Sequence, residues 1–325
     1  MNDLIQAMKA AGEPTRMRIL LVLHRSELTV TEICRILGQS QPRVSRHLKL
    51  LCDAGLLARQ AEGTSAYYRH ARSAFAQQFL SSLRPLVNLD TPVVARDEQQ
   101  LAMIRAERAE VAARSFEKIT LEAELLEDQH APDNDVEAAM LAAVGPDKVD
   151  RLLDIGTGTG RVLELFAPNI SNGIGVELSR EMLNLARTQL DAKRLHHCSV
   201  KHGNAYNLDV HPGSVNLAVL HHVLHFLEEP ARAIEQAAQT IEPDGRLLIV
   251  DFGPHLIEAL RTDHGHRRLG FADEEVLEWC GTAGLGDVSI THLELADCDP
   301  PGLTVTVWLA HQHGDSHRTP RLVVA

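Results

Sequence analysis

The sequence has no long apolar run. None of its windows approaches the roughly 20 consecutive apolar residues that span a bilayer, so we expect no membrane partner. The first residues also lack the basic segment, the apolar segment and the small-residue cleavage site of a secretory signal peptide. Both absences favour a protein that works in the cytoplasm.

Cysteine is scarce as well. The chain has five, Cys34, Cys52, Cys198, Cys280 and Cys298, and no two of them form a Cys-x-x-Cys pair. A scattered set of this kind predicts neither a disulfide framework nor a closed zinc site. The fold must then rest on ordinary hydrophobic cores, and a length of 325 residues suggests two domains.

Basic residues are in the minority, yet they are concentrated in one region. The whole chain has a net charge of −12, whereas residues 1–90 hold 12 Lys and Arg against 7 Asp and Glu, a net charge of +5, which leaves −17 for the remainder. An acidic protein ordinarily does not bind nucleic acid. A basic first quarter on an acidic body points instead to a separate module with a polyanionic partner.

The basic region is predicted to contain a helix-turn-helix. Thr29 and Glu32 have the spacing of a capping box at the start of a short helix. Gly38 ends that helix, and Ser40 caps a second helix that runs to about Ala54. Two short helices joined by a turn with glycine are typical of this DNA-binding motif.

The second helix carries side chains suited to DNA. Its apolar residues fall on one stripe, which leaves Arg, Gln, Ser, His and Lys side chains for the other faces. Arg and Gln suit base edges, and Ser, His and Lys suit phosphates. Segments 56–60 and 66–70 predict a hairpin, or wing, that brings two more arginines to the DNA backbone; a solvated basic helix in an unrelated bundle is the alternative. The expected DNA contacts are Ser40, Gln41, Arg43, Ser45, Arg46, His47, Lys49, Arg59 and Arg69.

The stretch from Gln39 to Leu57 closely resembles the winged-helix repressors of the ArsR/SmtB type, which are dimeric regulators of bacterial promoters. The resemblance covers residues 1 to about 85 and implies double-stranded promoter DNA as a partner. In arsenic-sensing members a Glu-Leu-Cys-Val-Cys pattern before the turn supplies two thiol ligands. Here Thr29 and Thr31 replace both cysteines, and Cys34 alone cannot chelate a soft ion. Metal sensing is therefore not carried over.

Two segments follow the predicted wing. Residues 71–90 have the pattern of an apolar helix, which predicts a homodimer interface through the N-terminal domain, with ordinary core packing as the alternative. Residues 95–130 are rich in Ala, Glu and Arg and contain no Gly or Pro. This composition predicts a long linking helix or a helix pair rather than a third domain.

Strand and helix patterns alternate from residue 152 onward. After a first strand that ends at Asp154, the predicted strands are 173–177, 199–202, 215–221, 246–251, 288–293 and 303–309, and the predicted helices are 161–167, 179–192, 231–241 and 274–283. This alternation predicts a doubly wound, seven-stranded α/β sheet. Such a sheet binds its ligand beyond the carboxyl ends of the strands, near the first one.

A glycine turn after the first strand predicts a nucleotide-like ligand. Gly156, Gly158 and Gly160 directly follow Asp154. A nicotinamide dinucleotide needs the spacing Gly-x-Gly-x-x-Gly and would be repelled by a carboxylate beside its pyrophosphate. S-adenosylmethionine carries two cationic groups and a ribose diol, and Glu177, 23 residues after Asp154, is placed to accept both ribose hydroxyls. The pattern favours the adenosyl ligand.

Segments 154–160, 175–182 and 243–251 resemble the class I, Rossmann-like methyltransferases that depend on S-adenosylmethionine, over roughly residues 135–310. The resemblance implies that Asp154 and the glycines hold the amino-acid end of the cofactor, that Glu177 binds the ribose, and that Leu178 and Met182 pack on the adenine. Asn204 stands where these enzymes usually have Asp, and its amide oxygen can still accept the adenine amine. The expected cofactor contacts are Asp154, Gly156, Thr157, Gly158, Gly160, Glu177, Leu178, Met182, Asn204, Ala205 and His221.

Histidines are concentrated in the loops that should overhang the methyl group, at positions 221, 222, 225, 255, 264 and 266. Three interpretations remain open. The imidazoles bind a methyl acceptor or act as its general base; they bind a metal with an open coordination position; or they close the pocket over the cofactor's carboxylate, aided by Arg267. The candidates for catalysis are His221, His222 and His255, and the sequence assigns no metal ligand.

The order of the two modules resembles bacterial regulators that fuse an ArsR-type domain to a methyltransferase domain. We expect a winged helix at 1–90, a helical linker at 91–134, a methyltransferase domain at 135–310 and a flexible tail at 311–325. The predicted function is a DNA-binding repressor that senses S-adenosylmethionine or its product S-adenosylhomocysteine. An active small-molecule methyltransferase with an autoregulatory DNA-binding domain is the alternative.

Overall fold

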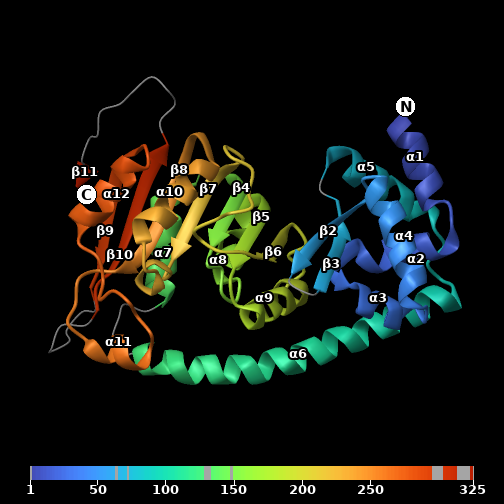
Figure 1. Ribbon diagram of the computed structural model, residues 1–325, viewed down its shortest axis with the longest axis horizontal. Helices are drawn as coiled ribbons and strands as arrows, with labels where there is room; N and C mark the ends of the chain where they lie inside the picture. The colour runs from blue at the N-terminus through green and yellow to red at the C-terminus, as the bar shows by residue number, and fades with distance from the viewer. Residues whose placement is uncertain are drawn as a thin grey trace. The chain divides into compact units, whose positions relative to one another are not determined.

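The computed structural model describes residues 2–62, 65–71, 73–127, 133–146, 149–294, 303–312 and 323–324. The chain divides into two compact units (Figure 1): the first holds residues up to 112 together with 191–196, and the second holds the remainder. No helix among the described residues is long and apolar enough to cross a bilayer.

The first unit contains the predicted helix-turn-helix. The Thr29 hydroxyl accepts the N–H of Glu32 at 3.3 Å, and the Glu32 carboxylate accepts the N–H of Thr29 at 2.7 Å, so the capping box is confirmed. Gly38 ends the helix in the left-handed region at φ 64°, where a side chain would be strained. The helices up to this point are α1 (Asn2–Ala11), α2 (Pro14–Val22), η1 (Leu23–Arg25), α3 (Val30–Leu37) and α4 (Gln41–Asp53).

The wing is confirmed and is longer than predicted. Strands β2 (Leu57–Glu62) and β3 (Ser65–His70) pair antiparallel, and their turn at residues 63–64 lies outside the described residues. A two-residue strand, β1 (Leu28–Thr29), pairs with the other edge of β3. The sequence does not predict β1, because two residues are too short to display a strand period.

Helix α5 (Ala74–Leu83), turn η2 (Arg84–Leu86) and helix α6 (Pro92–Glu127) complete this part of the chain. Ile104 of α6 is buried in the core of the first unit, and Asp97 accepts two hydrogen bonds from Arg18 of α2 at 2.6 and 2.7 Å. The predicted long helix is therefore present, and the compact first unit extends past the predicted boundary at residue 90 to residue 112. The early turns of α6 belong to the winged-helix unit because they have apolar and ionic partners there.

The second unit is a mixed sheet covered by helices. Its strands have the order β11-β9-β10-β8-β7-β4-β5-β6, with β4 to β8 parallel and β10 antiparallel to both of its long neighbours. The strands are β4 (Val149–Ile155), β5 (Ile170–Glu177), β6 (Cys198–His202), β7 (Val215–His221), β8 (Ile241–Phe252), β9 (Leu285–Leu293), β10 (Val305–Gln312) and β11 (Val323–Val324). The helices are α7 (Asp133–Val144), α8 (Arg161–Phe166), η3 (Ala167–Asn169), α9 (Arg180–Ala192), η4 (Leu224–Phe226), α10 (Pro230–Thr240), α11 (Glu258–Asp263) and α12 (Asp273–Thr282).

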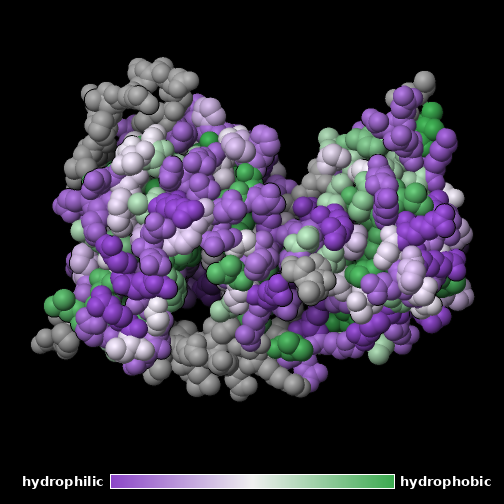
Figure 2. All heavy atoms as spheres, in the orientation of Figure 1, coloured by the Kyte–Doolittle hydropathy of each residue, from purple (hydrophilic) through white to green (hydrophobic). Residues whose placement is uncertain are grey.

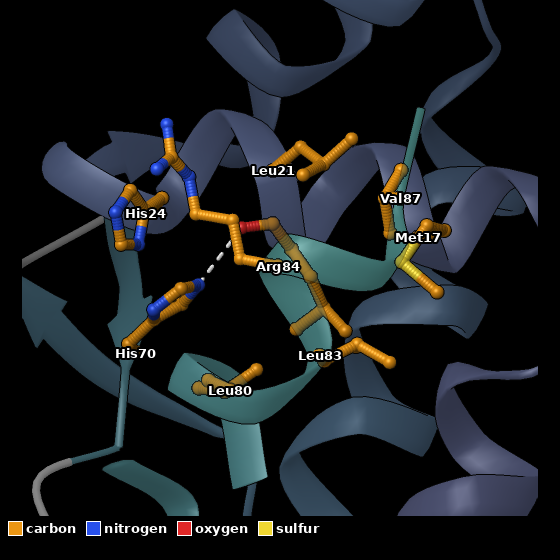
Figure 3. Close-up of a pocket in the computed structure, with 9 residues that line it drawn as sticks. Met17, Leu21, His24, His70, Leu80, Leu83, Arg84 and Val87 are labelled. Carbon is orange, nitrogen blue, oxygen red and sulfur yellow. Dashed lines mark hydrogen bonds between the residues drawn. The ribbon is translucent and has the colours of Figure 1, made fainter. Parts of the chain in front are cut away.

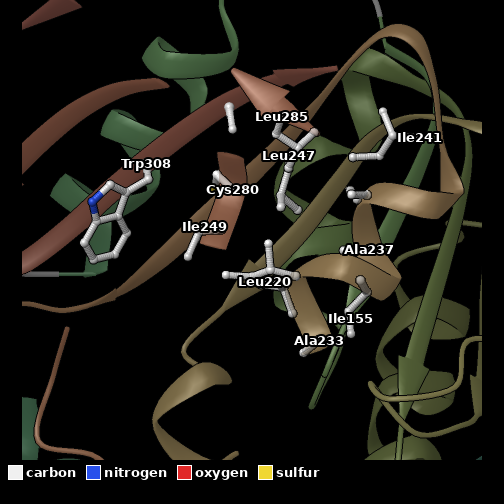
Figure 4. Packing of buried hydrophobic residues seen from close by; sticks show 14 of the residues in the cluster. Ile155, Leu220, Ala233, Ala237, Ile241, Leu247, Ile249, Cys280, Leu285 and Trp308 are labelled. Atoms are coloured by element: carbon white, nitrogen blue, oxygen red, sulfur yellow. The ribbon is translucent and has the colours of Figure 1, made fainter. Parts of the chain in front are cut away.

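The core of this unit lies between the sheet and helices α10 and α12. Figure 4 shows Leu247 and Ile249 of β8 facing Ala237 of α10 and Cys280 of α12, and all four side chains are fully buried. Leu248 is buried too but lies outside this cluster, because alternate residues of a strand point to opposite faces. Helix α7, which the sequence does not predict, contacts β8, β9 and β10.

All seven predicted strands are present, so the doubly wound α/β sheet is confirmed. The predicted flexible tail needs a correction. His311 and Gln312 belong to β10, where His311 pairs with Arg246. Val323–Val324 form an eighth strand, which pairs in parallel with β9 at the edge of the sheet. The other residues of that tail, 313–322 and 325, lie outside the described residues.

Candidate functional site

The glycine turn lies where β4 ends and α8 begins. Gly156 has φ 74°, and a Cβ atom there would meet a methyl carbon of Val223 at 2.3 Å. The N–H groups of Gly156 and Thr157 donate to the carbonyl of Val176 at 2.7 and 3.1 Å, which holds the turn against β5. Only glycine fits this close approach in this conformation. The free N–H groups of the first turn of α8 follow directly after Gly160.

Asp154 is the buried acid of this turn, with 1% of its surface exposed. Its carboxylate accepts the Thr157 hydroxyl at 2.5 Å. Burial raises the pKa of Asp154 to about 7; the Thr157 hydrogen bond opposes the rise, and the nearby Glu177 charge adds to it. A buried carboxyl that is so costly to ionise would be stabilised as the anion by a cationic ligand. A cationic group that binds beside Asp154 would provide that stabilisation.

Glu177 stands at the end of β5 and faces the turn. One of its oxygens accepts the N–H of Gly158 at 3.0 Å, and the other accepts the N–H of Ser179 at 2.8 Å. Each carboxylate oxygen has a second lone pair. Both oxygens therefore remain able to accept a ribose hydroxyl, while the backbone fixes their orientation. The ribose contact stays a prediction.

The predicted adenine contacts are partly exposed. Leu178 is 62% exposed, and Met182 and Ala205 are half-buried. Asn204 is exposed, and its amide oxygen accepts the N–H of Tyr206 at 2.9 Å within its own turn. An exposed apolar side chain beside the turn offers a surface for a flat base. The Asn204 oxygen has one lone pair left for an adenine amine.

Five of the histidines come together with a carboxylate that the sequence does not single out. Asp251, at the end of β8, is fully buried and accepts the Nδ1 hydrogen of His225 in η4 at 2.7 Å. The His266 ring stacks on His225 with 4.0 Å between centroids, and the His222 ring lies 4.6 Å from that of His221. His255 borders Phe252, the residue after Asp251, at 6.1 Å between ring centroids.

Burial makes these imidazoles weak bases. It lowers the pKa of both His221 and His266 to about 4, and it also lowers the pKa of His255. Burial of Asp251 alone would raise its pKa, but the charge and the hydrogen bond of His225 outweigh burial and lower it. His221, His255 and His266 are therefore neutral at neutral pH, and Asp251 is ionised.

Arg267 does not point toward the cluster. Its N–H donates to the carbonyl of His225 at 2.8 Å, but its guanidinium is exposed and lies 3.6 Å from the carboxylate of Glu228. His264 is half-buried and does not share the ring stacking that joins His266 to His225. The segment 264–268 thus contributes the His266 ring to the cluster rather than the arginine that the sequence suggests.

The candidate DNA-binding surface lies on α4 and the wing. The side chains that line its outer face are exposed, whereas Val44, Leu48 and Leu51 of the same helix are fully buried in the core. Ser40 occupies the N-cap position without a side-chain capping bond, so its hydroxyl is available to a phosphate. The exposed members of the predicted set are Ser40, Gln41, Arg43, Arg46, Lys49 and Arg59.

Three of the predicted DNA contacts are partly buried or paired with another side chain of the protein. Ser45 is half-buried, and the His47 ring lies 3.6 Å from the carboxylate of Glu13. Arg69 of β3 pairs with Glu27 at 3.4 Å. A helical period cannot reveal such partners, because they come from other elements. We expect these three residues to contribute less to DNA binding than the exposed ones.

Two cavities lie in the first unit. The smaller, of about 20 Å³, is lined mainly by apolar side chains, and His70 contacts the Leu20 carbonyl at 2.8 Å beside it (Figure 3). This volume holds about one water molecule. The larger, of about 270 Å³, lies among residues of α2, η1, η2 and the early turns of α6, including Arg84 and Asp97. Neither is lined by a glycine turn of the kind expected around an adenosyl ligand.

Comparison with known families identifies both modules. Residues 13–59 match the family described as bacterial regulatory protein, arsR family, and residues 153–249 match a methyltransferase domain. The chain is 44% identical over 66 residues to the arsenical resistance operon repressor of Escherichia coli, which covers 20% of this chain and 56% of that protein. It is 39% identical over 61 residues to an uncharacterized HTH-type transcriptional regulator of Methanocaldococcus jannaschii, covering 18% of this chain and 68% of that one.

The second module has relatives of its own. An uncharacterized methyltransferase of Bacillus subtilis, YcgJ, is 29% identical over 101 residues, or 31% of this chain and 40% of that protein. Its crystal structure superposes with a TM-score of 0.48 at 17% identity, covering 55% of this chain and 99% of that one. The chain thus spans about half the length of the first relatives that it matches. It belongs to the arsR family of bacterial regulatory proteins, and a methyltransferase domain follows its helix-turn-helix domain.

Proposed function

We propose that this protein is a transcriptional repressor that binds promoter DNA as a homodimer and takes S-adenosylmethionine or S-adenosylhomocysteine as its signal. The observation that carries the proposal is that a buried acid of raised pKa at a glycine turn, Asp154, coexists with an exposed basic helix, α4. Bacterial promoter DNA lies in the cytoplasm, so the proposal includes a cytoplasmic location.

The region that holds metal ligands in arsenic-sensing relatives has another use here. Thr29 caps α3, and its capping partner Glu32 also accepts two hydrogen bonds from Arg108 of α6, at 2.7 and 2.8 Å. Oxygen and carboxylate groups committed to a cap and an ion pair do not make a soft-metal site. A different signal is therefore required, and the second module offers a ligand site.

The chemistry of the glycine turn supports an adenosyl ligand with a cationic end. Asp154 gains a counter-ion when an ammonium group binds, and Glu177 presents two oriented oxygens to a ribose. A dinucleotide would bring a pyrophosphate to the same turn and be repelled by both carboxylates. S-adenosylmethionine and S-adenosylhomocysteine share the ammonium and the ribose, so both are included.

Exposed apolar side chains support the homodimer. Leu4, Ile5 and Met8 of α1 are 45%, 43% and 60% exposed, and Phe75 of α5 is 36% exposed. Figure 2 shows apolar atoms on the surface of α1. Apolar residues gathered on a surface mark an interface more often than isolated ones do. A repressor dimer would bury them and would place two copies of α4 on one operator.

Helix α6 is suited to connect ligand binding with DNA binding. Its N-terminal half forms three ion pairs with α2 and α3, at 2.6 to 2.7 Å: Arg18–Asp97, Arg108–Glu32 and Arg35–Glu107. Its residues from 113 on belong to the second unit. A ligand changes operator affinity only if it binds the two states of the protein with different affinities. A continuous helix anchored on α2 and α3 is an element that such a ligand can bias.

The test is a titration of both ligands against operator binding. The probe is a DNA fragment carrying the promoter of the gene that encodes this chain, and its affinity is measured without ligand and with saturating S-adenosylmethionine or S-adenosylhomocysteine. We expect at least one ligand to change the dissociation constant by about 5-fold or more, the lower range of allosteric coupling. Asp154→Ala should remove this response and leave the ligand-free affinity unchanged. Equal operator affinity without ligand, with S-adenosylmethionine and with S-adenosylhomocysteine would contradict the proposal.

An active methyltransferase with an autoregulatory DNA-binding domain is the second candidate. The buried His225–Asp251 pair favours it, because a carboxylate that orients an imidazole is a common arrangement for a general base. Transfer of a labelled methyl group from S-adenosylmethionine to any component of a cell extract, lost in Asp154→Ala, supports this version. Operator binding that responds to the ligands without any transfer supports the sensor alone.

A further inference from the structure

We propose that His222, His225 and Asp251 bind a divalent transition-metal ion. Each residue offers one donor atom, and the three atoms lie within 4.8 Å of one another. They come from different elements: His222 follows β7, His225 lies in η4, and Asp251 is near the end of β8. His222 and His225 are three residues apart in the sequence, and the fold brings Asp251 to them from the neighbouring strand.

The distances suit a bound ion. His225 Nδ1 and an oxygen of Asp251 are 2.7 Å apart, a hydrogen-bond distance that has to lengthen by under about 1 Å when both atoms bind one ion. Two donors that bind one tetrahedral zinc ion at about 2.0–2.2 Å stand about 3.3–3.6 Å apart. A third donor within 4.8 Å of both therefore needs only a small movement to join them.

The surroundings also resemble those of metal sites. Asp251 is fully buried, and the N–H of Phe252 donates to it at 2.8 Å, which fixes its orientation. The Phe252 ring lies 4.7 Å from His222 and 5.4 Å from His225, so the donors face an apolar wall. Oriented ligands inside a hydrophobic shell are typical of functional metal centres.

Two more imidazoles reinforce the inference. His266 is 3% exposed and stacks on His225, and its Nδ1 atom is buried without a hydrogen-bond partner among the described residues. The Nε2 atom of His255 is also buried and unpartnered within the described part of the chain. A buried polar atom without a partner destabilises the folded protein. A water molecule bound within the cluster would supply such a partner.

The donor set indicates the class of ion. Two imidazoles and one carboxylate suit zinc or another first-row divalent ion, and three protein ligands leave at least one position open. That position would lie at the edge of the sheet that carries the glycine turn, because β7 pairs with β4 and Val223, the residue after His222, lies against Gly156. The open position can therefore bind an oxygen atom of a small molecule held at this edge.

Metal binding to the full chain, stripped with a chelator, tests the site. We expect one equivalent of Zn²⁺ per chain by calorimetry and a visible absorption band with Co²⁺. His222→Gln and His225→Gln should each weaken Zn²⁺ binding by about 100-fold and abolish the Co²⁺ band. His264→Gln is the matched control, because it removes an imidazole from the neighbouring segment but not from the cluster, and it should change neither.

The chain has 18 histidines, so adventitious binding is the competing outcome. Binding that is weak, of variable stoichiometry, or unchanged in His222→Gln and His225→Gln would overturn the proposal. If His225→Gln unfolds, His222→Gln, whose side chain is partly exposed, decides the question together with the wild-type stoichiometry. The metal site does not depend on the proposed signalling role. Metal binding and the response of operator affinity to S-adenosylmethionine are measured in separate experiments, so either one can fail while the other succeeds.

Discussion

The two candidate functional surfaces of this protein are built in opposite ways. The candidate DNA-binding surface is made of exposed side chains, most of them on the single helix α4, and it lies in a region with a net charge of +5 over residues 1–90. The candidate ligand site joins strand ends separated by long stretches of sequence, and its central carboxyl, Asp154, is 1% exposed. Exposed contacts act almost independently and are screened by salt, whereas a buried charge depends on each of its neighbours. Substitutions on the two surfaces should therefore differ in both size and character.

The largest expected effect is on the buried site. Asp154→Ala should weaken binding of S-adenosylmethionine by on the order of 100-fold or more, because it leaves a desolvated ammonium group unpaired. Asp150→Ala is the control, since Asp150 lies on the same strand β4 but is exposed. Calorimetry measures both. If both substitutions reduced the affinity for S-adenosylmethionine equally, the assignment of Asp154 as the partner of the ammonium group would be wrong.

Arg46→Ala should have the largest effect on the exposed surface. Losing one arginine contact to a base costs about 1–3 kcal/mol, or about 5- to 150-fold in operator affinity. Arg69→Ala should cost less, because Arg69 is already paired with Glu27 at 3.4 Å. Fluorescence anisotropy with a labelled operator fragment compares the two. A greater loss for Arg69→Ala would mean that the wing, not α4, reads the DNA.

The pH dependence of ligand binding separates the two surfaces further. The pKa of Asp154 is raised to about 7 in the folded protein, so the acid is largely protonated at pH 6 and largely ionised at pH 7.5. The cationic ligand binds the ionised form, and its own α-ammonium remains mostly protonated up to pH 7.5. Affinity should therefore rise by roughly fivefold from pH 6 to 7.5, because the gain in ionised Asp154 exceeds the partial loss of the protonated ammonium. A flat profile would show that Asp154 is ionised throughout this range, and Asp154→Asn should give such a profile at lower affinity.

The smallest effect concerns Lys49, which is exposed on α4. Lys49→Ala should reduce the slope of log affinity against log salt by about 1 and weaken operator and unrelated DNA alike. Binding curves at several salt concentrations measure this slope. A loss confined to the operator would instead assign Lys49 to a base contact.

Local signals in the sequence predict most of the first unit. The capping box of Thr29 and the positive φ of Gly38 are consequences of adjacent residues, so both can be identified from the sequence alone. The partners of His47 and Arg69 cannot, because Glu13 and Glu27 are distant in sequence. Strand β1 has too few residues to form a pattern.

The second unit follows the same rule. Strand β7 has the predicted bounds, and Asp154 and Glu177 both face the turn as expected from their places at the ends of strands. The sequence does not single out Asp251 as a site residue, although it too is an acid after an apolar run. Its partner His225 is 26 residues away, and the two meet only because β7 and β8 are neighbours in the sheet.

If the protein is a ligand-responsive repressor, its two surfaces are thermodynamically coupled, and coupling is reciprocal. The most direct test measures the affinity for S-adenosylmethionine and for S-adenosylhomocysteine with and without saturating operator DNA. We predict that the operator changes the affinity for the signalling ligand by the same factor by which that ligand changes operator affinity, and that unrelated DNA has no such effect. Ligand affinities that the operator leaves unchanged would mean that the two modules share a chain but not a function.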